Sequence, residues 1–366
     1  MMGKIFMVFL SIIIPAYNSK KTIAPLIFSI AAAAKVDFGE IEIVIVDDGS
    51  TDGTVEKIEK DDKLLRSLNK LKSIKIIKLK KNSGPAAARN IGVKYASGKI
   101  VLFLDADVVL YKNTLFEVIR SFKNDLDLYA LTGVWDKRQK SDKFFPKFKA
   151  LRDWSYWINE RNPRDYYYLF STRIAAIDRG LFLRLGGFNT TYKAALVEDI
   201  ELTYRIAKRY AVVFNPKVKV AHEFEGFLPI AKKYFWRSYY WSRIYRERKK
   251  FDPVATTSKE AITTISAGLL VLFSFLYFIM IILNYKTGVI VGGVYLSLKS
   301  IIFTFLSLIL FIHLRGVRKF LWFCLKEEGL LFAIKAFFTG IALYLVILSG
   351  AGASLFTVSS QARQGK

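Results

Sequence analysis

Two aspartates that follow an apolar run are the first candidates for chemistry in this sequence. Asp105 and Asp107 flank one alanine directly after the run 100–104. Carboxylates two positions apart at a strand end can share one hard cation, and Mg²⁺ or Mn²⁺ often keeps substrate phosphates in its shell. Ordinary loops also carry such pairs, so the pair indicates a metal site only in a supporting context.

A second acidic group ends another apolar run. Asp47 and Asp48 begin the stretch 47–53, Asp-Asp-Gly-Ser-Thr-Asp-Gly. These carboxylates could accept hydrogen bonds from the base or ribose of a nucleotide, and the glycines permit tight turns. The stretch is also a good strand-to-helix turn with Ser50 or Asp52 as the helix cap. Both interpretations can hold together.

A third group opens a predicted helix. Gly84 and Pro85 precede three alanines, and Arg89 follows about one turn in. Small side chains let a ligand or a strand approach a helix closely, and Arg89 could meet a phosphate. The alanines are equally suited to packing the helix on a sheet.

The first half of the chain alternates between strand-like and helix-like segments. The expected strands are 10–15, 41–46, 74–79 and 100–104, and the expected helices are 22–34, 54–71 and 85–96. This alternation predicts a mostly parallel sheet covered on both faces. Polar residues follow three of these strands, and ligands bind beyond the carboxyl ends of such strands. One site at this edge is therefore expected.

Several segments in this order resemble the motifs of family 2 glycosyltransferases, whose GT-A fold is a Rossmann-like α/β fold. The matching segments are SIIIPAYN (11–18), IVIVDDGSTDGT (43–54), GPAAARNIG (84–92), FLDAD (103–107), and GGF (186–188) followed by Val197-Glu198-Asp199. The resemblance covers roughly residues 10–225. One such motif would be weak evidence, but five in the expected order are strong.

The resemblance implies how a donor would be held. Asp105 and Asp107 would bind the divalent cation, Mg²⁺ or Mn²⁺, that bridges the diphosphate of a nucleotide sugar. The start of the chain would supply part of the nucleotide's cradle. With the groups above, the predicted substrate-binding set is Pro15, Ala16, Tyr17, Asp47, Asp48, Gly84, Arg89, Asp105 and Glu198.

The resemblance also implies a catalytic base. Asp199 would take the proton of an acceptor hydroxyl, giving in-line attack and inversion at the anomeric carbon. Glu198 would be a supporting residue, because adjacent residues on one element point in different directions. His222 falls where this fold often supplies a third metal ligand, and a structural histidine is an equal alternative. Processive synthases of the family carry Gln-x-x-Arg-Trp, which this sequence lacks.

Charge and hydropathy predict a membrane partner. The net charge is +25, and much of the basic excess lies at 232–250, just before an apolar region. Juxtamembrane Lys and Arg are attracted to an anionic leaflet by about 1 kcal/mol each, whereas no nucleic-acid motif is present. The basic and aromatic stretch 229–250 predicts an interfacial helix; a basic helix packed on the head is the alternative. A single cysteine, Cys324, excludes an intramolecular disulfide.

Three membrane spans are expected at 261–285, 288–314 and 336–357, with Lys299 interrupting the second. The basic linker 315–328 and the head would lie on the cytoplasmic side of the cell membrane by the positive-inside rule. The predicted organisation is a GT-A domain (1–228), an interfacial helix and linker (229–260), a transmembrane region (261–357) and a tail (358–366).

These expectations combine into one function. The chain would be an inverting, metal-dependent glycosyltransferase that moves one monosaccharide from a nucleotide sugar to a polyprenyl phosphate or lipid-linked glycan. A non-processive transferase acting on a surface polysaccharide or glycolipid headgroup is the first alternative. A catalytically silent membrane scaffold that retains the fold is the second. A nucleotidyltransferase is disfavoured because it has no reason to carry three spans.

Overall fold

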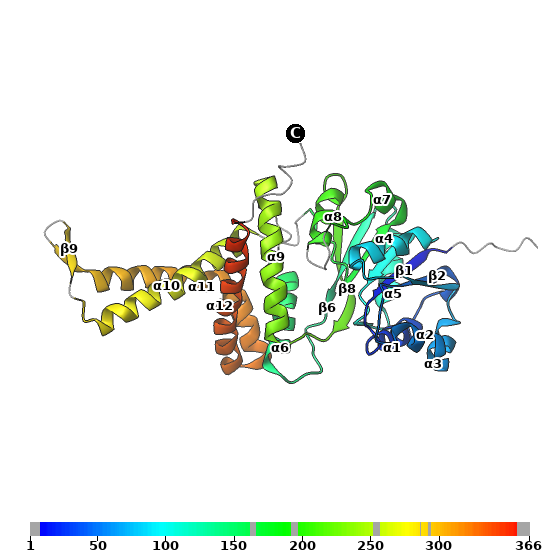
Figure 1. The fold of residues 1–366 in the computed structure, drawn as a ribbon, viewed down its shortest axis with the longest axis horizontal. Helices are drawn as coiled ribbons and strands as arrows, with labels where there is room; N and C mark the ends of the chain where they lie inside the picture. The colour runs from blue at the N-terminus through cyan, green and yellow to red at the C-terminus, as the bar shows by residue number, and fades with distance from the viewer. Residues whose placement is uncertain are drawn as a thin grey trace, which may run out of the picture. The chain divides into compact units, whose positions relative to one another are not determined.

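The computed structural model describes residues 8–161, 166–191, 197–251, 257–285, 287–291 and 294–356. These residues form two compact units, Met1–Phe224 and Glu225–Lys366. The first unit is a sheet with helices on both faces, and the second is built from long helices (Figure 1). The predicted boundary at residue 228 differs from this division by four residues, because the first long helix begins at Phe227.

The described part of the first unit contains an eight-stranded sheet in the order β3-β2-β1-β4-β7-β6-β8-β5. Its strands are β1 (Leu10–Ala16), β2 (Ile41–Asp47), β3 (Ser73–Lys78), β4 (Ile100–Leu104), β5 (Val108–Leu110), β6 (Ala130–Trp135), β7 (Ile174–Asp178) and β8 (Val212–His222). The strands β1 to β4 pair in parallel, β7 runs antiparallel to β4 and β6, and β8 is parallel to β6. Six of these eight strands therefore run in one direction, as predicted for a mostly parallel sheet, and β5 and β7 run in the opposite direction.

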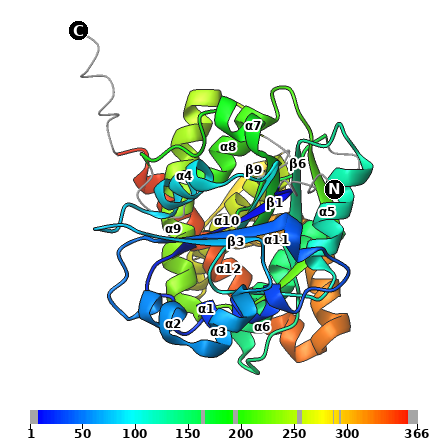
Figure 2. The ribbon, with the colours of Figure 1, turned by 90° about the vertical axis from the view of Figure 1, so that its right-hand side faces the viewer.

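Helices cover the two faces of this sheet (Figure 2). One face carries α1 (Ile23–Ala31), α2 (Thr54–Lys60), α3 (Asp62–Leu68) and α5 (Thr114–Asn124), and the other carries α4 (Pro85–Tyr95), α7 (Arg179–Arg184) and α8 (Glu198–Ile206). The helix α6 (Phe144–Ser155) continues into a π-helical turn, Tyr156–Glu160. The strands β1, β2 and β4 are buried on both faces, which explains their continuous apolar sequences.

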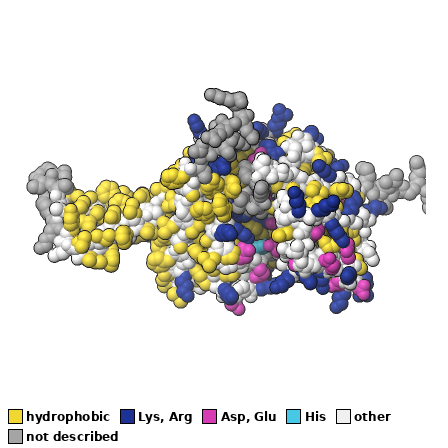
Figure 3. Space-filling view, in the orientation of Figure 1, with side chains coloured by type: hydrophobic (Ala, Val, Ile, Leu, Met, Phe, Trp, Pro, Cys, Tyr) yellow, Lys and Arg dark blue, Asp and Glu magenta, His cyan; other side chains and the backbone are white. Residues whose placement is uncertain are grey.

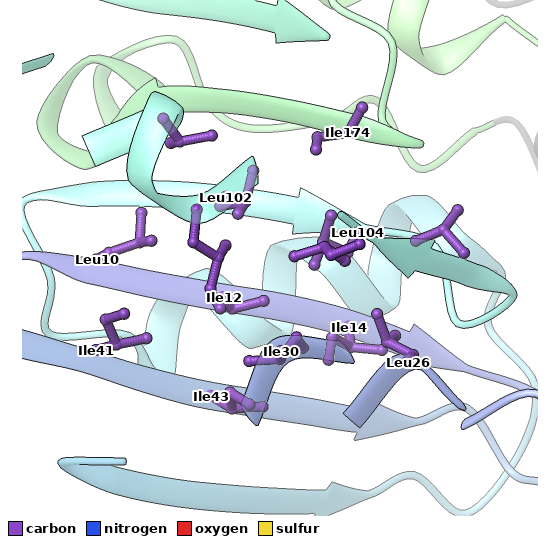
Figure 4. Close-up of a cluster of buried hydrophobic side chains, with 14 of the residues drawn as sticks. Leu10, Ile12, Ile14, Leu26, Ile30, Ile41, Ile43, Leu102, Leu104 and Ile174 are labelled. Carbon is purple, nitrogen blue, oxygen red and sulfur yellow. The ribbon is translucent and has the colours of Figure 1, made fainter. Parts of the chain in front are cut away.

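The side chains of β1 alternate between two hydrophobic clusters. Ile12 and Ile14 pack with Leu26 and Ile30 of α1 on one face (Figure 4). Ile13 points to the opposite face, where it packs under α4, α7 and α8. Because the strand period is two, this alternation orients every residue that follows the strand. The end of β1 is thus held rigidly at the edge of the sheet.

The predicted helix 54–71 is wrong as a single element. The structure has two helices there, α2 and α3, separated at Asp61. The Asp61 carboxylate accepts hydrogen bonds from the backbone N–H groups of Lys63 and Leu64, so it caps α3 and starts a new helix. The other predicted elements of the head agree with β1 to β4, α1 and α4 to within a few residues at their ends.

The second unit contains α9 (Phe227–Arg248), α10 (Ser258–Ile282), α11 (Leu298–Glu328), α12 (Leu330–Ala353) and a hairpin of β9 (Gly288–Val291) and β10 (Val294–Ser297). Within the described residues, α10, α11 and α12 are long and apolar enough to cross a membrane. The predicted number of spans is therefore confirmed by length and composition.

The bounds predicted for the second span are wrong. Residues 288–291 and 294–297 form β9 and β10, and α11 begins at Leu298, where the Ser297 hydroxyl accepts a hydrogen bond from Ser300 N. The helix continues through the predicted linker 315–328 and ends at Gly329, whose φ is +87°. Helical spacing explains the continuation, because the apolar side chains of that stretch recur on one buried face: Val317, Phe320 and Cys324.

Small residues bring the long helices close together. Gly316 of α11 lies against Thr263 of α10, and Gly350 of α12 lies against Phe235 O and Ser238 Oγ of α9. A side chain at either glycine would collide with these atoms. At one end of this contact, Arg246 of α9 donates to the hydroxyl and carbonyl oxygens at residue 354. The basic helix α9 thus packs on α12, with close backbone approach of the kind found between membrane helices.

One buried carboxylate holds the amino-terminal edge of the sheet. Glu42 of β2 is 1% exposed. It accepts hydrogen bonds from Ser11 Oγ at 2.6 Å, Ser97 Oγ at 2.9 Å and Lys75 Nζ at 3.2 Å. Burial raises the pKa of Glu42, but the hydrogen bonds outweigh burial and lower this pKa from 4.5 to about 2. The carboxylate therefore joins three strands and the chain before β4 in its ionised form.

We predict that Glu42→Gln destabilises the protein in a pH-dependent way. The folded pKa lies below the unfolded value of 4.5, so the ionised group stabilises the fold above that pH, and its contribution, on the order of 3 kcal/mol, fades as pH falls toward 2. Thermal unfolding of the full chain in detergent should show a lower midpoint for the variant at pH 7, and a shrinking difference below pH 4.5. Glu59→Gln, in an exposed ion pair, is the control and should change little. Equal midpoints at pH 7 would contradict this role.

Candidate active site

The polar residues predicted for the site meet at one edge of the sheet. Because β1, β2, β4, β6 and β8 run in the same direction, their carboxyl ends lie together. Ligands of α/β proteins bind beyond this edge. On one face of the molecule a histidine side chain lies among acidic side chains (Figure 3). His222 ends β8 at this edge, and the Asp107 side chain beside it is half exposed.

The loops after β1 and β2 are fastened to each other. Asn18 N donates to Ser50 Oγ, and Thr51 N donates to Asn18 Oδ1, both at 2.9 Å. Asn18 has a φ of +49°, a left-handed conformation that asparagine tolerates better than most residues. Next to this turn, the side chain of Tyr17 is 50% exposed. A rigid turn therefore presents an aromatic ring to solvent at the end of β1.

The remaining residues of the predicted nucleotide cradle lie at the same edge. Pro15 and Ala16 close β1, and Ala16 is 1% exposed, so it offers almost no surface to a ligand in this structure. Asp47 ends β2 and is 5% exposed. Its carboxylate lies 3.4 Å from Ser50 N. The contact of these residues with a nucleotide stays a prediction.

Asp48 holds the turn that opens α4. It is 2% exposed, and its two carboxylate oxygens accept hydrogen bonds from Ser83 N and Gly84 N, each at 2.8 Å. Burial raises the pKa of Asp48, and these two hydrogen bonds offset the rise only in part. Gly84 has a φ of +89°, which glycine adopts without strain. Asp48 thereby positions the start of α4 beside the nucleotide cradle.

Arg89 of α4 joins two carboxylates from distant parts of the chain. Its Nη2 donates to Asp105 Oδ1 at 2.7 Å, and its Nη1 donates to Glu198 Oε1 at 3.1 Å. The Arg89 and Glu198 side chains are nearly fully buried, at 2% and 3% exposure. Burial lowers the pKa of Arg89, but the charges of Asp105 and Glu198 raise it by more. The guanidinium is therefore charged, and its predicted contact with a phosphate stays a prediction.

Asp107 and His222 face each other across β5 and β8. The antiparallel register pairs Val108 with His222, which brings His222 Nε2 to 3.2 Å from Asp107 Oδ2. The rings of Trp135 and Phe224 lie against the imidazole, with centroids 5.4 Å and 4.8 Å away. The Asp107 side chain is half exposed. The structure thus brings together two of the three predicted metal ligands.

The residues at this edge fit a divalent cation that also binds substrate. No group of three His, Cys, Asp or Glu side chains within the described ranges is close enough to hold a metal by itself. Asp105 is turned toward Arg89 through one of its oxygens. Carboxylate and imidazole ligands suit Mn²⁺, and Mg²⁺ commonly uses one or two carboxylates with substrate phosphates as the other ligands. A substrate diphosphate would therefore complete the coordination that the protein begins.

Asp199 lies in the first turn of α8. Its Oδ1 accepts a hydrogen bond from Ile200 N at 2.8 Å, and its carbonyl accepts one from Thr203 Oγ1 at 2.6 Å. The side chain is half-buried, whereas the adjacent Glu198 is buried against Arg89. The two neighbours thus differ in burial, and their expected division into one base and one supporting residue stays a prediction. The role of Asp199 as the base stays a prediction.

A polar cluster that was not predicted from the sequence lies at the end of β6. Asp136 is 3% exposed and accepts hydrogen bonds from Tyr111 Oη and from Arg138 Nη2, with Lys219 Nζ 3.3 Å away. Burial raises the pKa of Tyr111, and the bond to Asp136 takes it further, to about 12. The loop that follows contacts the predicted metal ligand His222, because Gln139 Nε2 donates to the His222 carbonyl oxygen at 2.8 Å. Asp136 follows an apolar run, as Asp47 and Asp105 do, and that signal could have revealed it.

The sequence model described as Glycosyl transferase family 2 matches residues 11–196, half of the chain. The chain belongs to this family. The motifs from which this family was predicted all begin inside that range except for Val197-Glu198-Asp199, which follows it directly. The predicted family is thus confirmed, and the roles of individual site residues stay predictions.

Curated relatives of this glycosyltransferase family 2 chain match it over part of their length. The poly(ribitol-phosphate) beta-N-acetylglucosaminyltransferase TarS of Staphylococcus aureus is 40% identical over 130 residues, 34% of this chain and 21% of TarS. The poly-beta-1,6-N-acetyl-D-glucosamine synthase of Staphylococcus epidermidis is 33% identical over 132 residues, 36% of this chain and 30% of that protein. The match thus spans about a fifth to a third of these relatives.

A solved structure resembles this chain over nearly its full length. It is the mannosyltransferase PcManGT from Pyrobaculum calidifontis in complex with GDP-Man and Mn²⁺. The TM-score is 0.57, and the likeness covers 95% of this chain and 87% of the other at 18% sequence identity. Identity this low shows the fold alone. It confirms the predicted GT-A fold for the family 2 chain.

We predict that Asp48→Asn loosens the turn that opens α4. An amide has one acceptor oxygen where the carboxylate has two, so either Ser83 N or Gly84 N loses its partner. Hydrogen bonds to charged groups contribute about 1.5–3 kcal/mol, so amide exchange at one of these positions should accelerate by roughly tenfold or more. Native-state hydrogen exchange on the full chain checks this. Asp61→Asn is the matched control, since Asp61 also accepts from two backbone N–H groups, at a distant helix. Unchanged exchange at both positions would contradict the assignment.

Proposed function

We propose that this chain is an inverting, metal-dependent glycosyltransferase that moves one monosaccharide from a nucleotide sugar to a membrane-held acceptor. One observation carries the proposal: a buried arginine ties the carboxylate pair at the end of β4 to the helix that carries Asp199. A donor side and an acceptor side thus meet at one edge. Membership of glycosyl transferase family 2 supports the reaction class.

The donor side would use the edge formed by β1, β2 and β4. The exposed Tyr17 ring would lie against the nucleotide, with Asp47 on its other side and the turn held by Asp48 and Gly84 beneath it. Asp105, Asp107 and His222 would hold Mg²⁺ or Mn²⁺. When bound there, the cation offsets the negative charge that develops on the departing nucleoside diphosphate. The GDP-Man and Mn²⁺ of the solved mannosyltransferase support this choice of donor class and metal.

The acceptor side would use α8. Asp199 would take the proton of an acceptor hydroxyl while that oxygen bonds to the anomeric carbon and the bond to the diphosphate breaks. Attack from the face opposite the leaving group inverts the configuration. An ionised phosphate monoester has no such proton on its attacking oxygen. The base is therefore needed for a sugar hydroxyl on a lipid-linked glycan and not for a polyprenyl phosphate.

The second unit would hold the enzyme at the membrane. Hydrophobic side chains cover the surface of the α10–α11 pair (Figure 3), and several of the largest are more than half exposed: Phe275, Phe278, Phe303, Phe305 and Phe311. Lipid tails would cover such a surface. Basic side chains of α9 and of the second half of α11 would face the anionic cytoplasmic leaflet, which puts the head on the cytoplasmic side of a multi-pass protein.

A surface polysaccharide is the second candidate acceptor. The name of TarS states that it transfers N-acetylglucosamine to poly(ribitol-phosphate), and this chain is 40% identical to it over 130 residues. That match covers 34% of this chain and 21% of TarS. The apolar helices favour the lipid-linked acceptor, because an acceptor free in solution needs no membrane-held enzyme. Product size and lipid attachment distinguish the two.

We predict that a substitution at Asp199 lowers turnover, whereas substitutions at the proposed metal ligands weaken donor binding. Asp199→Asn should bind Mn²⁺ and nucleotide sugar as wild type does, but its kcat for a hydroxyl acceptor should fall by about 10²–10⁴. Asp107→Asn and His222→Gln should weaken Mn²⁺-dependent binding of UDP-GlcNAc or GDP-Man, followed by calorimetry. EDTA should abolish transfer and Mn²⁺ should restore it.

The control for these variants is Asp125→Asn, which removes a carboxylate that interacts with its own loop. It should leave binding and turnover unchanged. Wild-type protein that binds donor and metal without any turnover, and does so equally well in Asp199→Asn, would contradict the enzyme and support a scaffold.

We predict that the sugar is delivered to a lipid from the cytoplasmic side. Inverted membrane vesicles containing the protein should transfer label from UDP-GlcNAc or GDP-Man to organic-extractable lipids, whereas sealed right-side-out vesicles should not. Mass spectrometry of the extract identifies the acceptor. With a lipid-linked glycan the Asp199→Asn variant should be inactive, and with a polyprenyl phosphate it should retain most activity. Label confined to water-soluble products or to a polymer on a gel would contradict the lipid acceptor.

A further inference from the structure

Arg89 lies on α4, a helix that packs tightly on the sheet. Its neighbours Ala86 and Ala88 are buried on the sheet, and Gly92 lies so close to β1 that a Cβ there would be 2.5 Å from Ile13 Cγ2. The turn before the helix is held by Asp48. The backbone of α4 therefore cannot shift without moving the strand beneath it. The backbone atoms that carry the Arg89 side chain are thus held in one position.

The helix α4 also forms hydrogen bonds with the chain segment that precedes α8. Asn90 Nδ2 donates to Phe188 O, and Phe188 N donates to Asn90 Oδ1, both at 2.8 Å. Gly187 makes this approach possible, since its φ is +71° and a Cβ there would lie 2.6 Å from Asn90 Oδ1. The Arg89 guanidinium lies 5.7 Å from the Phe188 ring centroid. Two successive residues of α4 thus hold the acceptor-side segments at Phe188 and at Glu198.

Stability does not explain why an arginine is buried here. The Arg89 Nε atom has no hydrogen-bond partner among the described residues. A buried, incompletely paired charge carries a large desolvation cost, and apolar residues of similar volume commonly serve a protein's stability as well or better. What the arginine adds is geometry, because a guanidinium fork can hold two carboxylates at fixed positions and an ammonium group cannot.

We propose that Arg89 is a positioning residue that sets the placement of the donor-side carboxylate Asp105 relative to α8 and its base Asp199. The inference rests on the proposed function, since it assumes that Asp105 serves the cation and Asp199 the acceptor. It assigns the Arg89 side chain to these two carboxylates and not to a substrate phosphate. Its charge also acts on Asp199, which is near enough to affect Arg89 electrostatically.

The structure predicts different effects for the two ends of this bridge. Arg89→Lys keeps a positive charge but cannot hold both carboxylates, so it should weaken Mn²⁺ binding in the presence of UDP-GlcNAc or GDP-Man by about tenfold. It should also lower kcat by roughly 10- to 100-fold. Glu198→Gln weakens the contact between Arg89 and α8 and leaves the contact between Arg89 and Asp105 in place. It should lower kcat to a similar extent with Mn²⁺ binding and the donor KM nearly unchanged.

A double variant separates positioning from folding. Arg89→Leu combined with Glu198→Leu removes both buried charges, so thermal unfolding should return close to the wild-type midpoint after the drop expected for Arg89→Leu alone. Mn²⁺ binding should stay weak, because Asp105 still lacks its partner. Arg179→Lys is the matched control, as its guanidinium bonds Gly98 O near the opposite edge of the sheet. It should change neither Mn²⁺ binding nor kcat.

Two results would overturn the proposal. One is an Arg89→Lys variant that binds Mn²⁺ and turns over as wild type does. The other is recovery of Mn²⁺ binding in the double variant along with its stability, which would make the bridge purely structural. Failure of the proposed function looks different, because wild-type protein itself would then neither bind Mn²⁺ with a nucleotide sugar nor transfer the sugar.

Discussion

A charged guanidinium buried between two carboxylates connects the parts of this enzyme fold that must work together. Arg89 reaches Asp105 at the end of β4 and Glu198 at the start of α8, which are 93 residues apart in the chain. Both contacts are shielded from water on the arginine side, so they are strong and directional. Separating Glu198 from Arg89 would leave a buried carboxylate without its counter-charge. The end of β4 and the start of α8 are thus held at one spacing.

The direction of the strands imposes the second constraint. Because nearly all strands share one direction, each apolar run delivers its following polar residue to the same edge. Carboxylates then shape the loops there: Asp48 holds the turn before α4, and Asp136 holds the loop that leads to Gln139 and His222. The site is therefore built on backbone turns held by buried side chains, and few of its residues are free to move independently.

The second unit follows a different rule. Apolar composition suffices to predict three long helices, because any stretch of that kind must satisfy its backbone groups internally in lipid. Composition does not set where each helix begins. Ser297 caps α11 and Gly329 ends it, so the helix starts later and ends later than the predicted span 288–314. The contact between α9 and α12 depends on Gly350, whose importance is visible only once the two helices are placed side by side.

The sequence alone determined the family, the alternation of strands and helices in the head, and the aspartates at the strand ends. These are local properties, since periodicity and short motifs record them directly. Tertiary structure decided which of these residues meet. The register of β5 on β8 pairs Asp107 with His222, and the seating of α4 turns Arg89 away from solvent and onto Asp105 and Glu198. Asp136 follows an apolar run that could have marked it, but its partners Tyr111, Arg138 and Lys219 are brought to one place only by folding.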